Sequence, residues 1–291
     1  MLRVSQLLTL ERPSHTRTWS MPTARGEFAV LDTAPMDAAP YRGVALLVPG
    51  FLGSKEDFLP LLSGLSEGGY RVVALDGRGQ YETGAASSEP SYTQVELARD
   101  VMAVARRLDA GAVHLLGHSY GGMIARAAVL DSSGDRSLWA SLTLMNVGPG
   151  PVSAGQRERL GMLLTGLESM SPDELWPFVR QRRSEAAEEV REFLHRRWLA
   201  NVPAHLAAAA GQMRGETDRT PQLARIDLPK AVLSGSPDGT WSPEEVEEMA
   251  HRLGARLVPL PGGGHSPNVH LPDETASALV DFWDRSAASP R

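Results

Sequence analysis

The residue best suited to do chemistry is Ser119, in the pattern Gly117-His118-Ser119-Tyr120-Gly121. A short apolar run, Val113 to Leu116, precedes the pattern, and an alanine-rich helical stretch follows it. Glycines at both flanks fit a sharp strand-to-helix turn, because its tight backbone leaves no room for a Cβ there. Such a turn exposes the serine hydroxyl at the N-terminus of a helix, where the helix dipole favours negative charge. The pattern predicts a serine nucleophile for acyl transfer.

A serine needs a base within hydrogen-bond reach, and a third group must hold that base. His265 is the candidate base, because it ends a glycine-rich loop that follows the last predicted strand and can reach across to the serine. The other seven histidines occupy strand, elbow, helix or N-terminal positions where a structural or exposed histidine is the default. They are His15, His114, His118, His195, His205, His251 and His270.

The acid that orients the imidazole is expected at the end of a strand between the serine and the histidine. Asp238 fits, since it follows the predicted strand 231 to 233 directly. Asp227 precedes that strand and so belongs at the wrong edge of the sheet. Asn146 ends another strand where an acid could sit, but an amide cannot stabilise an imidazolium in the same way. The chain order of Ser119, Asp238 and His265 is the one found in serine hydrolases with a strand-turn-helix nucleophile.

Two backbone N–H groups are needed to bind the oxyanion of the tetrahedral intermediate. The residue after the nucleophile, Tyr120, supplies the first. The segment Val48 to Ser54 supplies the second, because Gly50 permits a tight turn that aims the N–H of Phe51 into the site.

Short apolar runs alternate with helical stretches over most of the chain, which predicts an α/β fold with a mainly parallel sheet flanked by helices. Central runs end at Gly, Pro, Asp or Asn, so the polar loops gather at the carboxyl ends of the strands, where open α/β sheets bind ligands. The predicted strands cover residues 28–31, 44–48, 72–75, 113–116, 142–145, 231–233 and 256–260. Residues 1–25 are predicted to precede the first strand as an N-terminal extension.

The alternation stops between Gly148 and Pro229, where the pattern indicates an inserted all-helical cap over 149–228. The core of the α/β fold then comprises 26–148 and 229–291. Candidate cap helices lie around 155–169, 172–182, 185–200 and 203–213. One apolar face of the cap is expected to roof the site, and Leu52, Trp176 and Trp198 are candidate pocket residues, with the hydrophobic part of a substrate also bordered by the side chains of Phe51 and Tyr120.

With these motifs on one chain, residues 25 to 285 resemble the α/β-hydrolase superfamily, in its helical-cap group of haloperoxidase, esterase and epoxide-hydrolase relatives. The matching motifs are Pro49-Gly50-Phe51, Asp76-Gly77-Arg78-Gly79, the serine elbow, Gly235-Ser236-Pro237-Asp238 and Gly264-His265. The resemblance implies a Ser119-His265-Asp238 triad with Phe51 and Tyr120 as oxyanion donors, and a loop-stabilising role for Asp76 and Arg78. Pro49 stands where relatives commonly have His. The serine argues against epoxide hydrolases and haloalkane dehalogenases, which attack with an aspartate. Ser266 argues against a carbon–carbon bond hydrolase without excluding one, because such relatives often have an aromatic residue after the histidine.

The composition and net charge limit the classes of partner that the protein is expected to bind. The formal net charge is −6, which gives no attraction to nucleic acid or to an anionic membrane surface. The chain has no cysteine, which excludes disulfides and thiolate chemistry. Neither a secretory signal nor an apolar run of membrane-spanning length is evident, so a cytoplasmic location is expected. The expected partner is a small-molecule substrate, with no cofactor or metal, and a homodimer is possible.

The combined expectation is a serine hydrolase that cleaves a carboxylic ester of a small, partly hydrophobic substrate through an acyl-enzyme. A carbon–carbon bond hydrolase, a lactonase, a perhydrolase, an amidase or a thioesterase would use the same groups. An acyltransferase would exclude water from the acyl-enzyme. A ligand-binding receptor of the same fold is the alternative outside enzymes.

Overall fold

One eight-stranded sheet organises the protein in the computed structural model, which describes residues 7–37, 39–85, 91–179 and 186–288. The strand order is β1-β2-β4-β3-β5-β6-β7-β8. The β1/β2 and β2/β4 pairs are antiparallel, and every other pair is parallel. The strands are β1 Thr16–Thr23, β2 Gly26–Thr33, β3 Gly43–Val48, β4 Tyr70–Leu75, β5 Val113–His118, β6 Trp139–Met145, β7 Lys230–Ser236 and β8 Arg256–Pro261.

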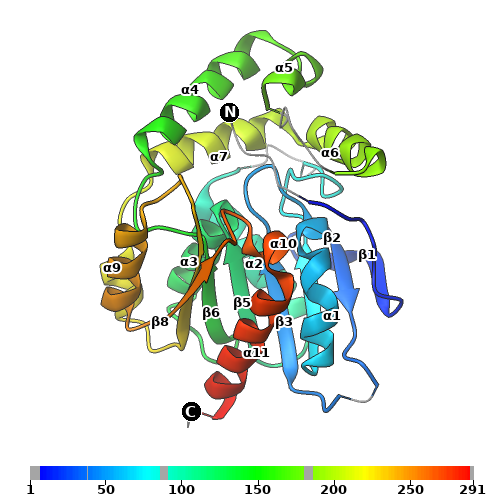
Figure 1. The fold of residues 1–291 in the computed structure, drawn as a ribbon, viewed down its shortest axis with the longest axis vertical. Coiled ribbons are helices and arrows are strands. Elements are labelled where there is room, and N and C mark those ends of the chain that lie inside the picture. The colour runs from blue at the N-terminus through cyan, green and yellow to red at the C-terminus, as the bar shows by residue number, and fades with distance from the viewer. Residues whose placement is uncertain (1–6, 38, 86–90, 180–185, 289–291) are drawn as a thin grey trace.

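Helices cover both faces of this sheet (Figure 1). Helices α1 and α11 pack on one face, while α2, α3 and α9 pack on the other. A 3₁₀ turn, η1, and a short helix, α10, lie in the loops after β3 and β8. The bounds are η1 Lys55–Phe58, α1 Leu59–Glu67, α2 Gln94–Arg107, α3 Tyr120–Asp131, α9 Pro243–Leu253, α10 Pro267–His270 and α11 Pro272–Ala288.

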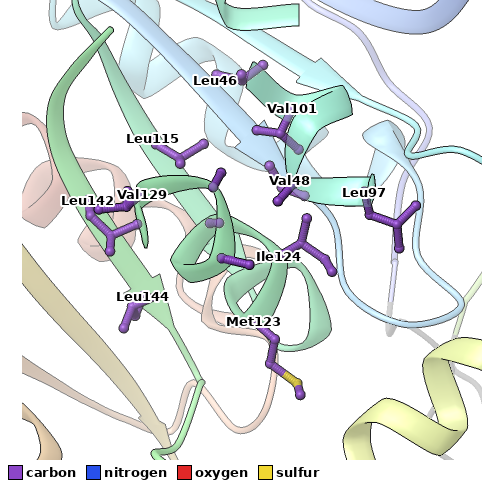
Figure 2. Close-up of a cluster of buried hydrophobic side chains, with 14 of the residues drawn as sticks. Leu46, Val48, Leu97, Val101, Leu115, Met123, Ile124, Val129, Leu142 and Leu144 are labelled. Atoms are coloured by element: carbon purple, nitrogen blue, oxygen red, sulfur yellow. The ribbon is translucent and has the colours of Figure 1, made fainter. Parts of the chain in front are cut away.

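Alternation along the central strands divides the core into two layers. In β3, Val44, Leu46 and Val48 face the α2/α3 layer, whereas Ala45 and Leu47 face the α1/α11 layer. Figure 2 shows the first layer, where side chains of the strands meet side chains of α2 and α3. Because both faces are buried, these strands are almost continuously apolar, as expected for parallel strands under helices.

The parallel strands bring their carboxyl ends to one edge of the sheet. The loops after β3, β5, β6, β7 and β8 therefore meet there, although they lie far apart in sequence. The seven predicted strands are all present as β2 to β8, and each is longer than predicted by at least one residue. The predicted α/β fold is confirmed.

The N-terminal segment is where the prediction was wrong. Residues 16–23 form β1, which pairs with β2 along its whole length, so the first strand begins well before residue 26. Half of the β1 side chains are exposed, so the strand lacks the continuous apolar run of its neighbours. Pro22 also removes one main-chain N–H donor from the strand. Both features are tolerated at a sheet edge. Residues 1–6 lie outside the described residues.

Among the described residues between β6 and β7, five helices follow one another, and we call them the helical insertion. They are α4 Ala154–Ser169, α5 Pro172–Val179, α6 Glu188–Ala200, α7 Pro203–Gly215 and α8 Thr220–Ala224. Figure 1 shows α4 to α7 together at one end of the sheet, above it in this view. Four were predicted; α8 was not, and the parts of two predicted helices within 180–185 lie outside the described residues. No helix among the described residues is long and apolar enough to cross a membrane.

Candidate active site

The turn between β5 and α3 has the strained backbone that its sequence predicts. Ser119 has φ 51° and ψ −121°, a conformation that L-residues rarely adopt. A Cβ on Gly121 would lie 2.3 Å from the carbonyl oxygen of Pro49, and one on Gly117 would lie 2.4 Å from that of Gly121. Both glycines are therefore required by close backbone packing, and the turn holds Ser119 at the start of α3.

The structure brings Ser119, His265 and Asp238 into one hydrogen-bonded chain. Nε2 of His265 lies 3.0 Å from Oγ of Ser119, and Nδ1 lies 2.8 Å from Oδ2 of Asp238. Because a carboxylate only accepts, Nδ1 carries the proton and Nε2 accepts from the serine hydroxyl. In this tautomer the imidazole is placed to take the hydroxyl proton as the oxygen attacks a substrate.

Asp238 is held as a carboxylate. Burial alone would raise its pKa, but the hydrogen bond and charge of His265, with further hydrogen bonds from Asn146 and Thr240, lower the pKa well below its usual range. The main-chain N–H of Thr240 donates to Oδ1 over 2.9 Å. A charged Asp238 can stabilise the imidazolium that forms when His265 accepts a proton.

Two side chains fix the glycine-rich loop that carries His265. The side-chain amide of Asn146 donates to the carbonyl oxygen of Gly264 over 3.1 Å. Nε2 of His118 lies 2.7 Å from the carbonyl oxygen of His265. Because a carbonyl only accepts, His118 carries its proton on Nε2. Burial lowers the pKa of His118 to about 4, so it stays neutral beside His265. A loop with three successive glycines gains from such ties, since glycine has the greatest backbone freedom to lose.

The turn after β3 lies directly against the nucleophile. A Cβ on Gly50 would be 3.2 Å from Cβ of Ser119, so the turn approaches the serine as closely as a glycine allows. Among the described residues, the main-chain N–H groups of Phe51 and Tyr120 have no hydrogen-bond partner. Two donors beside a nucleophile can bind an oxyanion.

Buried charges anchor the same turn. Lys55 is fully buried, and its main-chain N–H and Nζ donate to the two oxygens of Asp76 over 2.8 and 2.9 Å. Burial raises the pKa of Asp76, and the Lys55 charge opposes this rise. Arg78 binds Asp100 on α2 through two nitrogens. These contacts tie the loops after β3 and β4 to each other and to α2, in keeping with a loop-stabilising role for Asp76 and Arg78.

The side chain of Tyr120 joins the serine turn to the helical insertion. Its hydroxyl donates to Oε1 of Gln212 on α7 over 2.8 Å, and its ring packs edge-on against Phe51 and His205. The Tyr120 side chain is only 2% exposed. In this structure the side chain packs inside the protein, and its contact with a substrate stays a prediction.

The three candidate pocket residues belong to one apolar cluster between the turn after β3 and the insertion. Leu52 and Trp198 are each 2% exposed, and Nε1 of Trp198 donates to the carbonyl oxygen of Pro172. Trp176 is half-buried and stacks on His195 with ring centroids 4.9 Å apart. That these residues line a substrate pocket stays a prediction. Among the described residues, no group of three or more histidine or carboxylate side chains is placed to hold a metal ion.

Comparison with known proteins decides the family. Residues 45–278 match the model of the "Alpha/beta hydrolase family". The chain belongs to this family. The alpha/beta hydrolase is also 30% identical over 264 residues to "Putative carbamate hydrolase RutD" of Variovorax paradoxus (strain S110), which covers 86% of this chain and 95% of the relative. The chain is thus a hydrolase, an enzyme of the class that the sequence predicted.

Solved structures agree on the fold of this alpha/beta hydrolase. A thermophilic esterase from Thermogutta terrifontis superimposes with a TM-score of 0.72 at 23% identity, over 94% of this chain and 100% of the esterase. An esterase from Exiguobacterium antarcticum gives a TM-score of 0.74 at 20% identity, over 92% of this chain and 100% of that one. At these identities the likeness is one of fold.

Three contacts of the site carried little sequence signal. Asn146 stood out by its place at a strand end, but its bonds to two other loops were not predicted. His118 was expected to be structural, and its neighbouring position to the serine was the only clue that it contacts the His265 loop. The contact of Gln80 with Gly50 had no signal, because neither residue type nor spacing indicates it.

Proposed function

We propose that this alpha/beta hydrolase cleaves a carboxylic ester of a small, partly hydrophobic substrate through an acyl-enzyme on Ser119. The hydrogen-bonded chain from Asp238 through His265 to Ser119 carries the proposal. No other arrangement described above joins a nucleophile, a base and an acid beside two unpartnered N–H groups. We propose that the helical insertion acts as the cap over this site.

The reaction has two halves. Oγ of Ser119 attacks the substrate carbonyl carbon while Nε2 of His265 takes the hydroxyl proton, and the Phe51 and Tyr120 N–H groups bind the oxyanion. When the intermediate collapses, the carbon–oxygen bond to the alcohol breaks and His265 protonates the leaving oxygen. A water molecule, deprotonated by His265, then attacks the acyl-enzyme. The second intermediate expels Ser119, which regains its proton, and releases the acid.

A carbamate is the second candidate substrate. It is favoured by the 30% identity with a relative whose name gives carbamate hydrolase activity. A carbamate carbonyl requires the same nucleophile, base and oxyanion donors. The two candidates differ in the group beside the carbonyl, which is a carbon in an ester and a nitrogen in a carbamate.

The test is hydrolysis of p-nitrophenyl esters from acetate to decanoate, and of p-nitrophenyl carbamate, by the wild type and by Ser119→Ala. We expect the variant to lose ~10⁴-fold or more in kcat. Ser20→Ala is the matched control, because Ser20 lies on the exposed strand β1 and bonds Glu27. Labelling with a fluorophosphonate should modify the wild type and the control but not Ser119→Ala. Equal turnover by Ser119→Ala and wild type would overturn the proposal, and a higher kcat/KM on the carbamate than on every ester would select the second candidate.

A further inference from the structure

The side chain of Gln80 connects the loop after β4 to the turn after β3. Nε2 of Gln80 donates to the carbonyl oxygen of Gly50 over 3.0 Å, and Oε1 accepts the N–H of Gly77, also over 3.0 Å. These partners fix which end of the amide is which, because an N–H only donates and a carbonyl only accepts. Gln80 is 3% exposed, so bulk water has little access to either bond. Its amide group is thus held rigidly at both ends.

The carbonyl that Gln80 binds belongs to the same peptide group as the N–H of Phe51. A trans peptide is planar, so its C=O and N–H point in opposite directions. A donor that holds the oxygen of Gly50 therefore also aims the N–H of Phe51. The N–H of Gly53 donates to the same oxygen over 3.0 Å, which gives this carbonyl two donors.

The peptide between Ser119 and Tyr120 is held in a matching way. The carbonyl oxygen of Ser119 accepts from the N–H groups of Gly122 and Met123 over 2.9 and 3.4 Å, in the first turn of α3. Both peptides that could bind an oxyanion thus have a carbonyl with two donors. A carbonyl that accepts hydrogen bonds polarises its own peptide and strengthens the N–H as a donor, by an effect of about 10–30% per bond.

We propose that Gln80 is a positioning residue for the oxyanion site: it aims and polarises the Gly50–Phe51 peptide whose N–H stabilises the transition state. The inference rests on the proposed function. It identifies a side chain through which a main-chain donor can be tested, since the N–H of Phe51 itself cannot be removed by a side-chain change.

The experiment compares p-nitrophenyl butyrate with its thionoester, in which sulfur replaces the carbonyl oxygen. Sulfur accepts hydrogen bonds weakly, so the thionoester gains little from an oxyanion donor. Loss of a whole donor typically costs ~10²–10³-fold in rate, and we expect Gln80→Met to lower kcat/KM on the oxoester by about tenfold. On the thionoester, Gln80→Met should lower kcat/KM by about twofold or less, so the oxoester-to-thionoester ratio falls. Gln80→Glu, which turns the donor toward Gly50 into an acceptor, should lower the ratio further.

Thr83→Val is the control for loosening of the same loop. Oγ1 of Thr83 accepts the N–H of Ala29 over 2.9 Å and does not bond the turn after β3. This variant should lower thermal stability and leave the ratio unchanged. A wild-type ratio in a folded Gln80→Met protein would overturn the inference, as would equal losses on both substrates or failure of both Gln80 variants to fold. If esterase activity also survives in Ser119→Ala, the proposed function fails together with this inference. If activity depends on Ser119, only the inference about Gln80 fails.

Discussion

The side-chain nitrogen of Asn146 lies 3.0 Å from Oδ2 of Asp238, the same oxygen that accepts the Nδ1 proton of His265. The amide nitrogen also donates to the carbonyl oxygens of Gly235 and Gly264, and Oδ1 accepts the N–H of Gly235 over 3.0 Å. One side chain at the end of β6 thus joins the loop that carries the acid to the loop that carries the imidazole. We infer that Asn146 helps to set the distance between the carboxylate of Asp238 and the imidazole of His265.

Replacing Asn146 should therefore weaken catalysis through the geometry of its neighbours. Asn146→Ala leaves two carbonyls and one N–H without their partner, at a cost of about 1–3 kcal/mol in the free energy of unfolding. We expect kcat for p-nitrophenyl butyrate to fall by about tenfold, because small misplacements of catalytic groups are costly. Asn146→Asp should be worse, since a second carboxylate would stand beside Asp238.

Asn201→Ala is the matched control for this change. Asn201 is also buried, and its amide donates to the carbonyl oxygen of Arg197 in the helical insertion. We expect it to lose stability in urea denaturation with little change in kcat. Equal falls in kcat for the two alanine variants would show that Asn146 acts only through stability.

Gly121→Ala should disable the enzyme. The new Cβ would lie 2.3 Å and 2.4 Å from the carbonyl oxygens of Pro49 and Val48, which are backbone atoms that cannot rotate away. The turn that carries the Phe51 N–H would have to move, and we expect kcat to fall ~10²-fold or more. Steady-state kinetics and circular dichroism on the purified variant separate lost chemistry from lost folding.

Gly211→Ala is the opposite case and serves as its comparison. Gly211 lies inside α7, and nothing stands within 4 Å of an added Cβ. We expect the free energy of unfolding to rise by up to about 1 kcal/mol, with kcat unchanged, because alanine favours the helix over glycine. A stable, fully active Gly121→Ala protein, or an inactive Gly211→Ala protein, would contradict this account of the turn.

Acid should destabilise the fold through buried histidines. Burial lowers the pKa of His114 to about 4, from 6.5. Between these pH values the unfolded chain binds a proton that the folded protein does not, so the free energy of unfolding falls as the pH drops from 6.5 to 4. At about 1.4 kcal/mol per pKa unit, His114 contributes up to about 3 kcal/mol of this loss. His118 and His205, whose pKa values burial also lowers to about 4, act in the same direction.

His114→Gln tests this assignment away from the serine. His114 lies in the middle of the core, where Nδ1 is 2.8 Å from Oγ of Ser141 and the ring stacks on Trp283. The variant should be less stable at pH 7, yet lose less stability than the wild type between pH 6.5 and 4. Urea denaturation at pH 7, 5.5 and 4.5 gives the slope of the free energy of unfolding against pH for each protein. Parallel slopes would show that His114 does not titrate in this window.

Much of the site could be predicted from the sequence, because each of its residues lies in a short motif next to a strand. The strained serine turn needs glycines at fixed spacing, and the close contacts of Gly117 and Gly121 bear out that reasoning. Ser119, His265 and Asp238 each follow a recognisable strand, and parallel strands place their carboxyl ends at one edge. The sequence alone therefore determined the fold class, the family and which three side chains meet.

Only the tertiary structure decided how these parts are held. Gln80 and Gly50 are 30 residues apart, and Asn146 and Gly264 are 118 apart, so their hydrogen bonds exist only once the strands are in register. The burial of the Tyr120 side chain against α7 and the edge strand β1 likewise depend on distant partners. Local sequence sets backbone preferences and apolar periodicity, whereas a hydrogen bond between loops requires the packing of the whole sheet to bring donor and acceptor together.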